Sequence, residues 1–251
     1  MAANAEAGHH AVILTPNGQM KLIRNLTAFI MIVTLAAITF GQSGQIPNSA
    51  VPQEILGRQV RMTYPDRVTI TYAFMRVLSD ARVPGGLVTV SNCGEEVEHT
   101  LTPAGSSLRD VLDSIVSVAP LSRWQLEDGV VNLVPVKGEP PLLNLRLAEF
   151  NVKNATTVFD ALNRLLTLPD VQKRMAELHV SEVRTEVGLT NLKQPGSGTN
   201  EDRQGFTVHC KSATVREALN AIVRAHGYAV WAYRERHCNG RADYRIDFLA
   251  R

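Results

Sequence analysis

One helix pattern occurs four times in the sequence, and it limits the fold more than any other feature. In each copy a Ser or Thr is followed by apolar residues at positions +1, +4/+5 and +8/+9, which is the spacing of one apolar stripe on a helix of about three turns. The four copies begin at Thr69, Ser107, Thr157 and Thr214. In the last three, an acid stands three residues after the hydroxyl residue and predicts a capping box: Asp110, Asp160 and Glu217. Tyr72 takes that place in the first copy.

Two of these helices belong to a longer match. Residues 101–126 align with 208–233 without a gap, with five identities that include the only two tryptophans, Trp124 and Trp231. A short alternating segment precedes each helix, at 98–102 and at 206–209, and is typical of a strand. A hairpin signal follows each tryptophan: Asp128-Gly129 between 124–126 and 130–134, and Asn239-Gly240, with a longer loop, between 228–234 and 244–249. We therefore expect an internal repeat of a β-α-β-β unit.

The predicted fold class is α+β, with two small β-α-β-β units that each pack one helix on a short mixed sheet. Residues 52–138 form the first unit and 206–251 the second. Between them, 139–192 is a connecting β-α segment that holds the third helix and a further short helix at 171–178. Residues 193–205 (KQPGSGTNEDRQG) lack apolar side chains, which predicts a flexible loop.

The N-terminal region, residues 1–44, is interpreted as an extension followed by a signal peptide. Lys21 and Arg24 precede a run of uncharged residues, 26–40, which is short for a membrane span but suits the core of a signal peptide. Small residues follow, so cleavage near Gly41 is plausible, and Met20 is an alternative start to Met1. We expect a periplasmic or secreted protein. The alternative is an uncleaved anchor to the inner membrane formed by residues 21–40.

Charge and cysteine content exclude several classes of protein. The sequence has 26 Lys+Arg against 24 Asp+Glu, so it predicts no electrostatic binding of nucleic acid. Three cysteines are too few for a disulfide-scaffold protein. No glycine-rich phosphate loop is present, and no cofactor is predicted.

Three segments together resemble the short N-terminal domain of secretins and TonB-dependent receptors: 70–90, 106–135 and 214–233. The second of these, SSLRDVLDSIVSVAPLSRWQLEDGVVNLVP, has the order of capped helix and closing hairpin. The resemblance implies a periplasmic module that acts by contacting other proteins and that brings no catalytic residues. The sequence departs from the family in that no secretin pore region or run of barrel strands follows.

The last unit is rich in potential metal ligands and thiols: His209, Cys210, His226, His237 and Cys238. Their spacing fits no recognised metal pattern, and neighbouring strand residues point to opposite faces, so no metal site is predicted. A disulfide between Cys210 and Cys238 is the better prediction, because both are expected at the same end of the sheet and export favours the bond. Free, half-buried thiols are the alternative, and Cys93 is left over.

Other candidate sites have simpler structural interpretations. Trp124 and Trp231 could stack on a ligand, but their equivalent places favour filling the gap between helix and sheet. Arg109 and Arg216 also coincide, and an exposed guanidinium is expected at both. Cys93 and His99 form the only Cys/His pair outside the last unit, and their separation of six residues does not indicate the geometry that nucleophilic catalysis needs. A nearby polar turn holds three acids that are interpreted as solvated rather than catalytic: Glu95, Glu96 and Glu98.

The sequence thus predicts a non-enzymatic, exported protein-interaction module with no catalytic residues. Strand edges of its small sheets offer a route to partner binding by strand addition. The expected partner is a protein of the cell envelope, and contact with a membrane is expected only through the N-terminal segment if it is not cleaved. The alternative is a cell-wall or small-ligand binding module that uses Trp124 and Trp231. An enzyme whose site converges only in the fold is a third hypothesis.

Overall fold

The computed structural model describes residues 52–61, 67–94, 96–180, 183–187 and 205–249. All of them belong to one compact unit that runs from Pro47 to Arg251. The predicted signal segment and, apart from Gly205, the predicted flexible loop lie outside the described residues. Within the described residues, no helix has the length and hydropathy that a membrane span requires.

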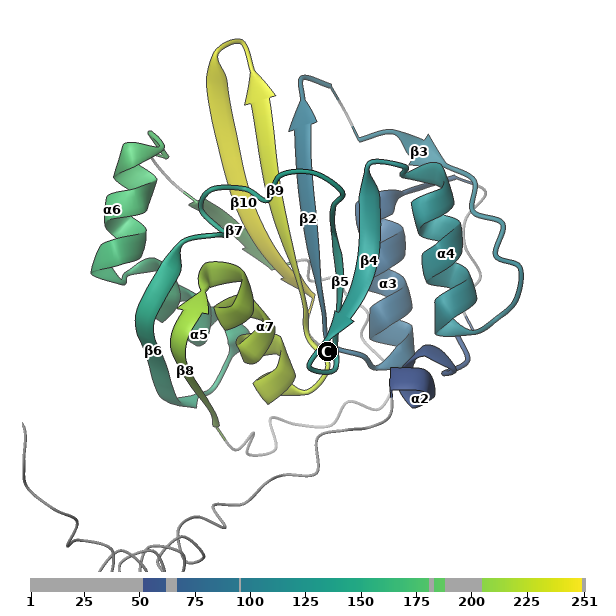
Figure 1. Cartoon of the computed structure of the whole chain (residues 1–251), viewed down its shortest axis with the longest axis horizontal. Helices are drawn as coiled ribbons and strands as arrows, with labels where there is room; N and C mark the ends of the chain where they lie inside the picture. The colour runs from purple at the N-terminus through teal and green to yellow at the C-terminus, as the bar shows by residue number, and fades with distance from the viewer. Residues whose placement is uncertain (1–51, 62–66, 95, 181–182, 188–204, 250–251) are drawn as a thin grey trace, which may run out of the picture. The chain divides into compact units, whose positions relative to one another are not determined.

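Helices and strands are interspersed along the chain, and the α+β class predicted from the sequence is confirmed (Figure 1). The elements are α2 (Pro52–Leu56), β1 (Val68–Thr69), α3 (Ile70–Ala81), β2 (Gly85–Asn92), β3 (Glu98–His99), α4 (Leu108–Val118), β4 (Ser122–Glu127), β5 (Val130–Pro135), β6 (Arg146–Ala155), α5 (Val158–Leu166), α6 (Pro169–Glu177), β7 (Val183–Val187), β8 (Phe206–Thr214), α7 (Val215–His226), β9 (Val230–Cys238) and β10 (Arg241–Leu249).

The four helices found from the apolar spacing begin where their hydroxyl caps predict. Ser107, Thr157 and Thr214 each form a capping box with the acid three residues later. Thr69 accepts a hydrogen bond from the backbone N–H of Tyr72 and caps α3 without an acid. Each cap satisfies backbone donors that the first helical turn leaves free, which is why so local a signal located all four helices.

The largest sheet has six strands in the order β4-β5-β2-β9-β10-β7. It takes strands from both expected units, so the structure differs from the prediction of a separate short sheet for each. β2 and β9 join in parallel along eight residue pairs, from Gly85 with Val230 to Asn92 with His237. We call this β2–β9 pair the seam. Joining the sheets here satisfies the backbone groups of two edges that separate sheets would leave open.

The two ends of this sheet are built alike. β4 is antiparallel to β5, which is parallel to β2; likewise β9 is antiparallel to β10, which is parallel to β7. Because β2 and β9 are parallel, β5 and β10 run in opposite directions. The second set of three strands therefore repeats the first after a half-turn about an axis that crosses the strands in the plane of the sheet.

This half-turn places the helices on opposite faces of the sheet. α3 and α4 cover one face over a core that includes Phe74, Leu112 and Leu133. α5 and α7 cover the other face over a core that includes Leu162, Ile222 and Trp231. Figure 1 shows the two helix pairs on either side of the strands, with the antiparallel pair β6–β8 beside α5 and α7.

The long hairpin β9–β10 is tighter at its tip than expected. Cys238 pairs with Arg241, so the turn consists of Asn239 and Gly240 alone, with φ angles of 51° and 73°. The longer loop expected from the sequence is wrong, because residues 235–238 continue β9 and residues 241–243 continue β10 as paired strands. The hairpin projects well beyond the ends of α3 and α7 in Figure 1.

Candidate functional site

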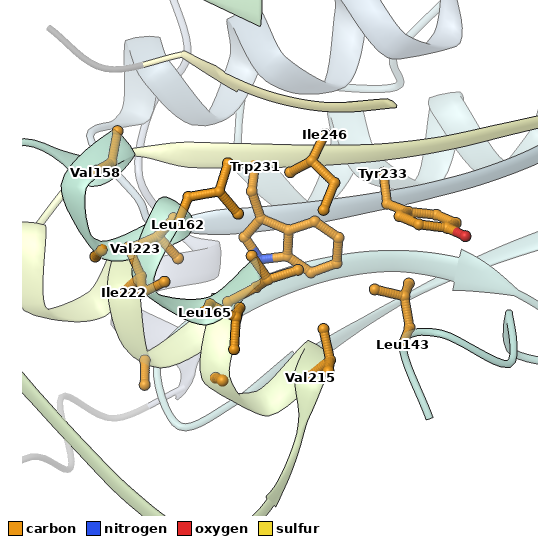
Figure 2. Close-up of a cluster of buried hydrophobic side chains, with 14 of the residues drawn as sticks. Leu143, Val158, Leu162, Leu165, Val215, Ile222, Val223, Trp231, Tyr233 and Ile246 are labelled. Atoms are coloured by element: carbon orange, nitrogen blue, oxygen red, sulfur yellow. The ribbon is translucent and has the colours of Figure 1, made fainter. Parts of the chain in front are cut away.

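Trp231 lies at the centre of one core and cannot meet a ligand. It is fully buried on β9, and its Nε1 donates a hydrogen bond of 2.9 Å to Oδ1 of Asn220 on α7. Figure 2 shows the indole among side chains of α5, α7 and β10. On the seam, Trp231 pairs with Gly86, where a Cβ atom would overlap indole atoms Cε2 and Cζ2. The stacking role considered for Trp231 is therefore wrong, and the structural interpretation is confirmed.

Trp124 makes the corresponding contact in a more open setting. Its Nε1 donates a hydrogen bond of 2.8 Å to Oδ1 of Asp113 on α4. Asp113 and Asn220 each stand eleven residues before their tryptophan. The guanidinium of Arg109 lies over the Trp124 ring, with Cζ 5.5 Å from the ring centroid. Trp124 is half-buried, whereas Trp231 is fully buried.

The strand that carries Trp124 lies at an open edge of the sheet. β4 pairs with β5 on one side, and no strand among the described residues pairs with its other side. β9, which occupies the corresponding place in the second set of strands, has β2 on that side. Two exposed apolar residues border the start of β4: Leu121 is 82% exposed and Val136 48%. They are joined by a backbone hydrogen bond of 2.8 Å between Val136 N and Leu121 O.

The two faces of β4 differ in chemistry. Trp124 and Leu126 pack against the core beneath α3 and α4. The alternate positions, on the other face of β4, are polar: the side-chain amide of Gln125 donates a hydrogen bond of 2.9 Å to the carboxylate of Glu127. A strand added at this edge would therefore meet apolar side chains on one face and polar ones on the other, in addition to the backbone groups of β4. We call β4 with Leu121 and Val136 the open edge.

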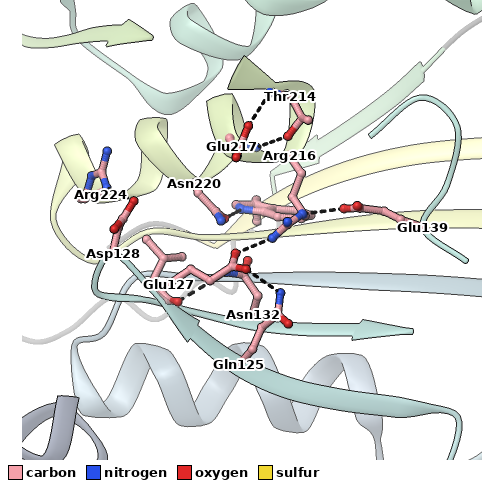
Figure 3. Close-up of polar contacts among 12 residues, drawn as sticks. Gln125, Glu127, Asp128, Asn132, Glu139, Thr214, Arg216, Glu217, Asn220 and Arg224 are labelled. Atoms are coloured by element: carbon pink, nitrogen blue, oxygen red, sulfur yellow. Dashed lines mark hydrogen bonds and ion pairs between the residues drawn. The ribbon is translucent and has the colours of Figure 1, made fainter. Parts of the chain in front are cut away.

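Arg216 is not the exposed residue that the sequence predicted. Its side chain is 15% exposed and lies between two carboxylates, with Nη1 2.5 Å from Glu127 and Nε 2.5 Å from Glu139. Figure 3 shows Arg216 reaching from α7 toward these two acids. Burial lowers the pKa of Arg216, but the hydrogen bond to Glu127 and the charge of Glu139 more than offset this, so the pKa is raised. Arg109, by contrast, is exposed as expected.

Arg216 is mostly buried because its helix lies next to the seam. α7 packs across it and contacts β2 and β5, so Arg216 meets one acid from β4 and one from the connection after β5. Arg224, two turns further along α7, pairs with Asp128 at 3.4 Å in the same way. These partners could not be identified from the sequence because they lie 77 to 96 residues away.

The structure does not bring Cys210 and Cys238 together, so the predicted disulfide is wrong. Cys210 lies on β8, in the separate two-stranded sheet, and pairs there with Phe150. All three thiols are free. The neighbour of Cys238 is Cys93, whose thiol hydrogen-bonds with it and raises its pKa. The prediction failed because β8 pairs with β6 and not with the hairpin that follows α7.

A chain of titratable side chains runs along one face of β9. The Tyr233 hydroxyl donates a hydrogen bond of 2.8 Å to the buried Glu235, and His237 Nε2 lies 2.6 Å from the other carboxylate oxygen. Burial, and then the charge of Glu235, raises the pKa of Tyr233. The carboxylate thus orients His237, but the thiol of Cys238 belongs to the next strand position and faces the other way. The pair does not form a thiol–imidazole dyad.

The remaining candidate ligands are dispersed. His209 faces Glu149 on β6 at 3.6 Å, and His226 packs edge-on against Phe206 and Tyr228. Among the described residues, no three His, Cys, Asp or Glu side chains are grouped so as to hold a metal ion. Glu96 accepts a hydrogen bond of 2.7 Å from the backbone of Thr71, and Glu98 lies 3.8 Å from Arg67. Glu95 lies outside the described residues.

One depression on the surface has a volume of about 520 Å³. It is lined by acids, arginines and short apolar or amide side chains: Glu139, Pro141, Asn144, Leu145, Arg146, Arg174 and Glu177. No histidine or cysteine is among them, so neither the oriented His237 nor a thiol faces this space.

The feature that sequence reasoning missed is the contrast between the two tryptophans. The signal that could have found it is the pair Gly85-Gly86 in a segment otherwise typical of a strand, since glycine inside a strand often marks a close approach by another group.

The chain was compared with protein-family models, with curated proteins and with solved structures, and no match was found.

Proposed function

We propose that the protein is a non-enzymatic, exported interaction module that binds an extended segment of a partner protein by strand addition at the open edge. One observation carries this proposal: the same tryptophan–helix arrangement is covered by a strand at the seam, whereas no strand of the described residues covers it at β4. Backbone groups along β4 supply hydrogen bonds for an added strand, and the alternation of its side chains supplies selectivity.

The seam also indicates what the partner segment has to look like. β2 pairs with β9 in parallel and places Gly86 against the Trp231 indole, where no side chain fits. Trp124 holds its indole to α4 by the equivalent hydrogen bond. A strand that adds in the same way has glycine opposite Trp124, followed by two apolar residues and then by an alternation of polar and apolar residues, as in β2.

The edge strand β7 of a second copy does not meet this requirement. β7 occupies the place in its set of strands that β2 occupies in the first. By register, Glu186 of β7 corresponds to Gly86, because it pairs with Asp247 as Gly86 pairs with Asn132. Head-to-tail extension of the sheet would therefore set a residue other than glycine against Trp124. This supports a different protein as the partner.

Peptide binding to the full chain tests the proposal. A peptide with the sequence of residues 84–92, PGGLVTVSN, should bind and change the emission of Trp124. Replacing its second glycine, which corresponds to Gly86, with valine should weaken binding at least tenfold, although valine favours strands. Replacing the first glycine with alanine is the matched control, because the atoms that crowd Gly85 in the protein, from Leu78 and Val131, have no counterpart at β4.

The protein variant Trp124→Phe should lose both the emission change and the preference for glycine. Tyr228→Ser, which alters an exposed aromatic residue beyond α7, should bind like the unchanged chain. Equal binding of the glycine and valine peptides, or binding of neither, would contradict strand addition at this edge.

Export is a separate part of the proposal and rests on the basic and apolar pattern of residues 21–40 and the small residues that follow. The resemblance to the N-terminal domain of secretins and TonB-dependent receptors supports the same location. Determining the N-terminal sequence of the protein isolated from cells tests it. A mature chain that begins near residue 42 supports cleavage and release, whereas a chain that retains residues 21–40 in the membrane fraction supports the anchored alternative.

A further inference from the structure

Cys93 and Cys238 lie side by side at the end of the seam. The last register pair of β2 with β9 is Asn92 with His237, so each cysteine follows directly at the next position. The Cys238 thiol hydrogen-bonds with that of Cys93, and Cys93 Sγ lies 3.7 Å from the carbonyl oxygen of His237. The two residues are 145 positions apart in the sequence, and only the parallel pairing of the two halves brings them together.

From this placement we infer that Cys93 and Cys238 are a site of reversible disulfide formation that covalently closes the seam. Neighbouring strands are about 4.8 Å apart, which lies within the range of Cα–Cα distances of about 4.4–6.8 Å found across disulfides. The bond therefore needs rotation of two side chains and no shift of the strands.

Accessibility favours this pair over any other in the chain. Cys93 is exposed and Cys238 is half-exposed, so a disulfide oxidant can reach the first thiol. Arg236 and the backbone N–H of Gly94 both favour the thiolate of Cys238, although the hydrogen bond with Cys93 outweighs them. Cys210 sits in the other sheet, and burial raises its pKa, which lowers its thiolate fraction.

The oxidant is a protein or small-molecule disulfide. The Cys93 thiolate attacks one sulfur of that disulfide and releases the other as a thiolate, which leaves a mixed disulfide on Cys93. The Cys238 thiolate then attacks the Cys93 sulfur and releases the second oxidant thiolate. Two cysteine thiols are thereby oxidised with loss of two protons, and one disulfide is reduced to two thiols.

Closing this bond should stabilise the fold against unfolding. It joins β2 of the first half to β9 of the second and closes a loop of more than 140 residues, which restricts the unfolded chain. We expect the midpoint of thermal unfolding to rise by about 5–10 °C on oxidation. The inference rests on the seam and is independent of the partner proposed for the open edge.

Disulfide mapping tests the inference, because each cysteine falls in its own tryptic peptide: 83–109, 204–211 and 237–241. The folded full chain, incubated with oxidised glutathione, should yield one linked pair, 83–109 with 237–241, and the shifted midpoint. The same incubation in denaturant should give a mixture of pairings, since the fold no longer selects one.

Single variants separate the pairings. Cys210→Ser should oxidise like the unchanged chain, and Cys93→Ser should form no intramolecular bond and show no shift of the midpoint. Cys238→Ser should behave like Cys93→Ser and serves as a second check if one variant folds poorly. A Cys210–Cys238 linkage in the folded chain, stable glutathione adducts without the internal bond, or three thiols that stay reduced would each overturn the inference.

Discussion

Single residues in equivalent places have different environments in this protein, and the two tryptophans are the clearest case. Trp231 is enclosed between α7 and Gly86, whereas Trp124 has no neighbouring strand among the described residues. The variant Trp124→Phe, which retains Trp231, should therefore emit at shorter wavelength than Trp231→Phe. Acrylamide should quench the emission of Trp231 several-fold less than that of Trp124. Both differences should vanish in denaturant, and equal quenching in the folded variants would contradict the enclosed position of Trp231.

The residue scale also shows where sequence reasoning stops. The hydroxyl caps and the apolar stripes depend on neighbours within one or two helical turns, so Ser107 and Thr214 were predictable. Arg109 and Arg216 have the same local sequence context and were expected to behave alike. They differ because Glu127 and Glu139 approach only Arg216, across the seam. No local pattern contains that information.

At the scale of one element, the start of α7 connects a local contact to the pH dependence of stability. The backbone N–H of Thr214 donates to the Glu217 carboxylate over 2.6 Å, and this bond lowers the pKa of Glu217 against a smaller effect of burial. A carboxylate with a lowered pKa stabilises the fold at pH values above its unfolded pKa, and this stabilisation is lost as the pH falls through the folded pKa.

Glu217→Gln should isolate the contribution of the charge, because glutamine keeps the shape and hydrogen bonds of the protonated acid. We expect the variant to be less stable by about 0.5–1 kcal/mol near pH 6. The difference in the free energy of unfolding should shrink as the pH falls below the unfolded pKa of Glu217, and it should disappear once the pH has passed through the lowered folded pKa, because the acid is then protonated in both states. Urea titrations across this pH range measure the difference in the free energy of unfolding. The carboxylate of Asp160 caps α5 and also has a lowered pKa, so Asp160→Asn should show the same trend. A difference that stays constant with pH would contradict it.

For the whole molecule, the decisive feature is the union of two sets of strands in one sheet. The β-α-β-β order, both hairpins and the helix positions were predictable because each is a local pattern. The seam was not, because β2 and β9 pair over a separation of about 145 residues, and the pair Gly85-Gly86 indicates a close approach without identifying the strand that approaches. The open edge could not be predicted either, since an edge is defined only once the strand order is known.

The ion pairs across the seam provide a test of how strongly the two halves depend on each other. Replacing Arg216 with methionine leaves Glu139, whose side chain is 23% exposed, without its cation. Because Glu127 remains partly solvated, we expect the free energy of unfolding to fall by about 1–3 kcal/mol, below the value for fully buried pairs.

Arg109→Met is the matched control at the equivalent position, where the guanidinium is exposed over Trp124. Its cost should be below about 1 kcal/mol, the upper range for an exposed cation–π contact. Since the halves share one sheet and α7 packs across the seam, both variants should unfold in a single transition seen equally by far-ultraviolet circular dichroism and tryptophan emission. An equal or larger loss in Arg109→Met would contradict the role assigned to Arg216. Two separate transitions in the unchanged chain would show that the halves fold independently and that the seam contributes little to holding them together.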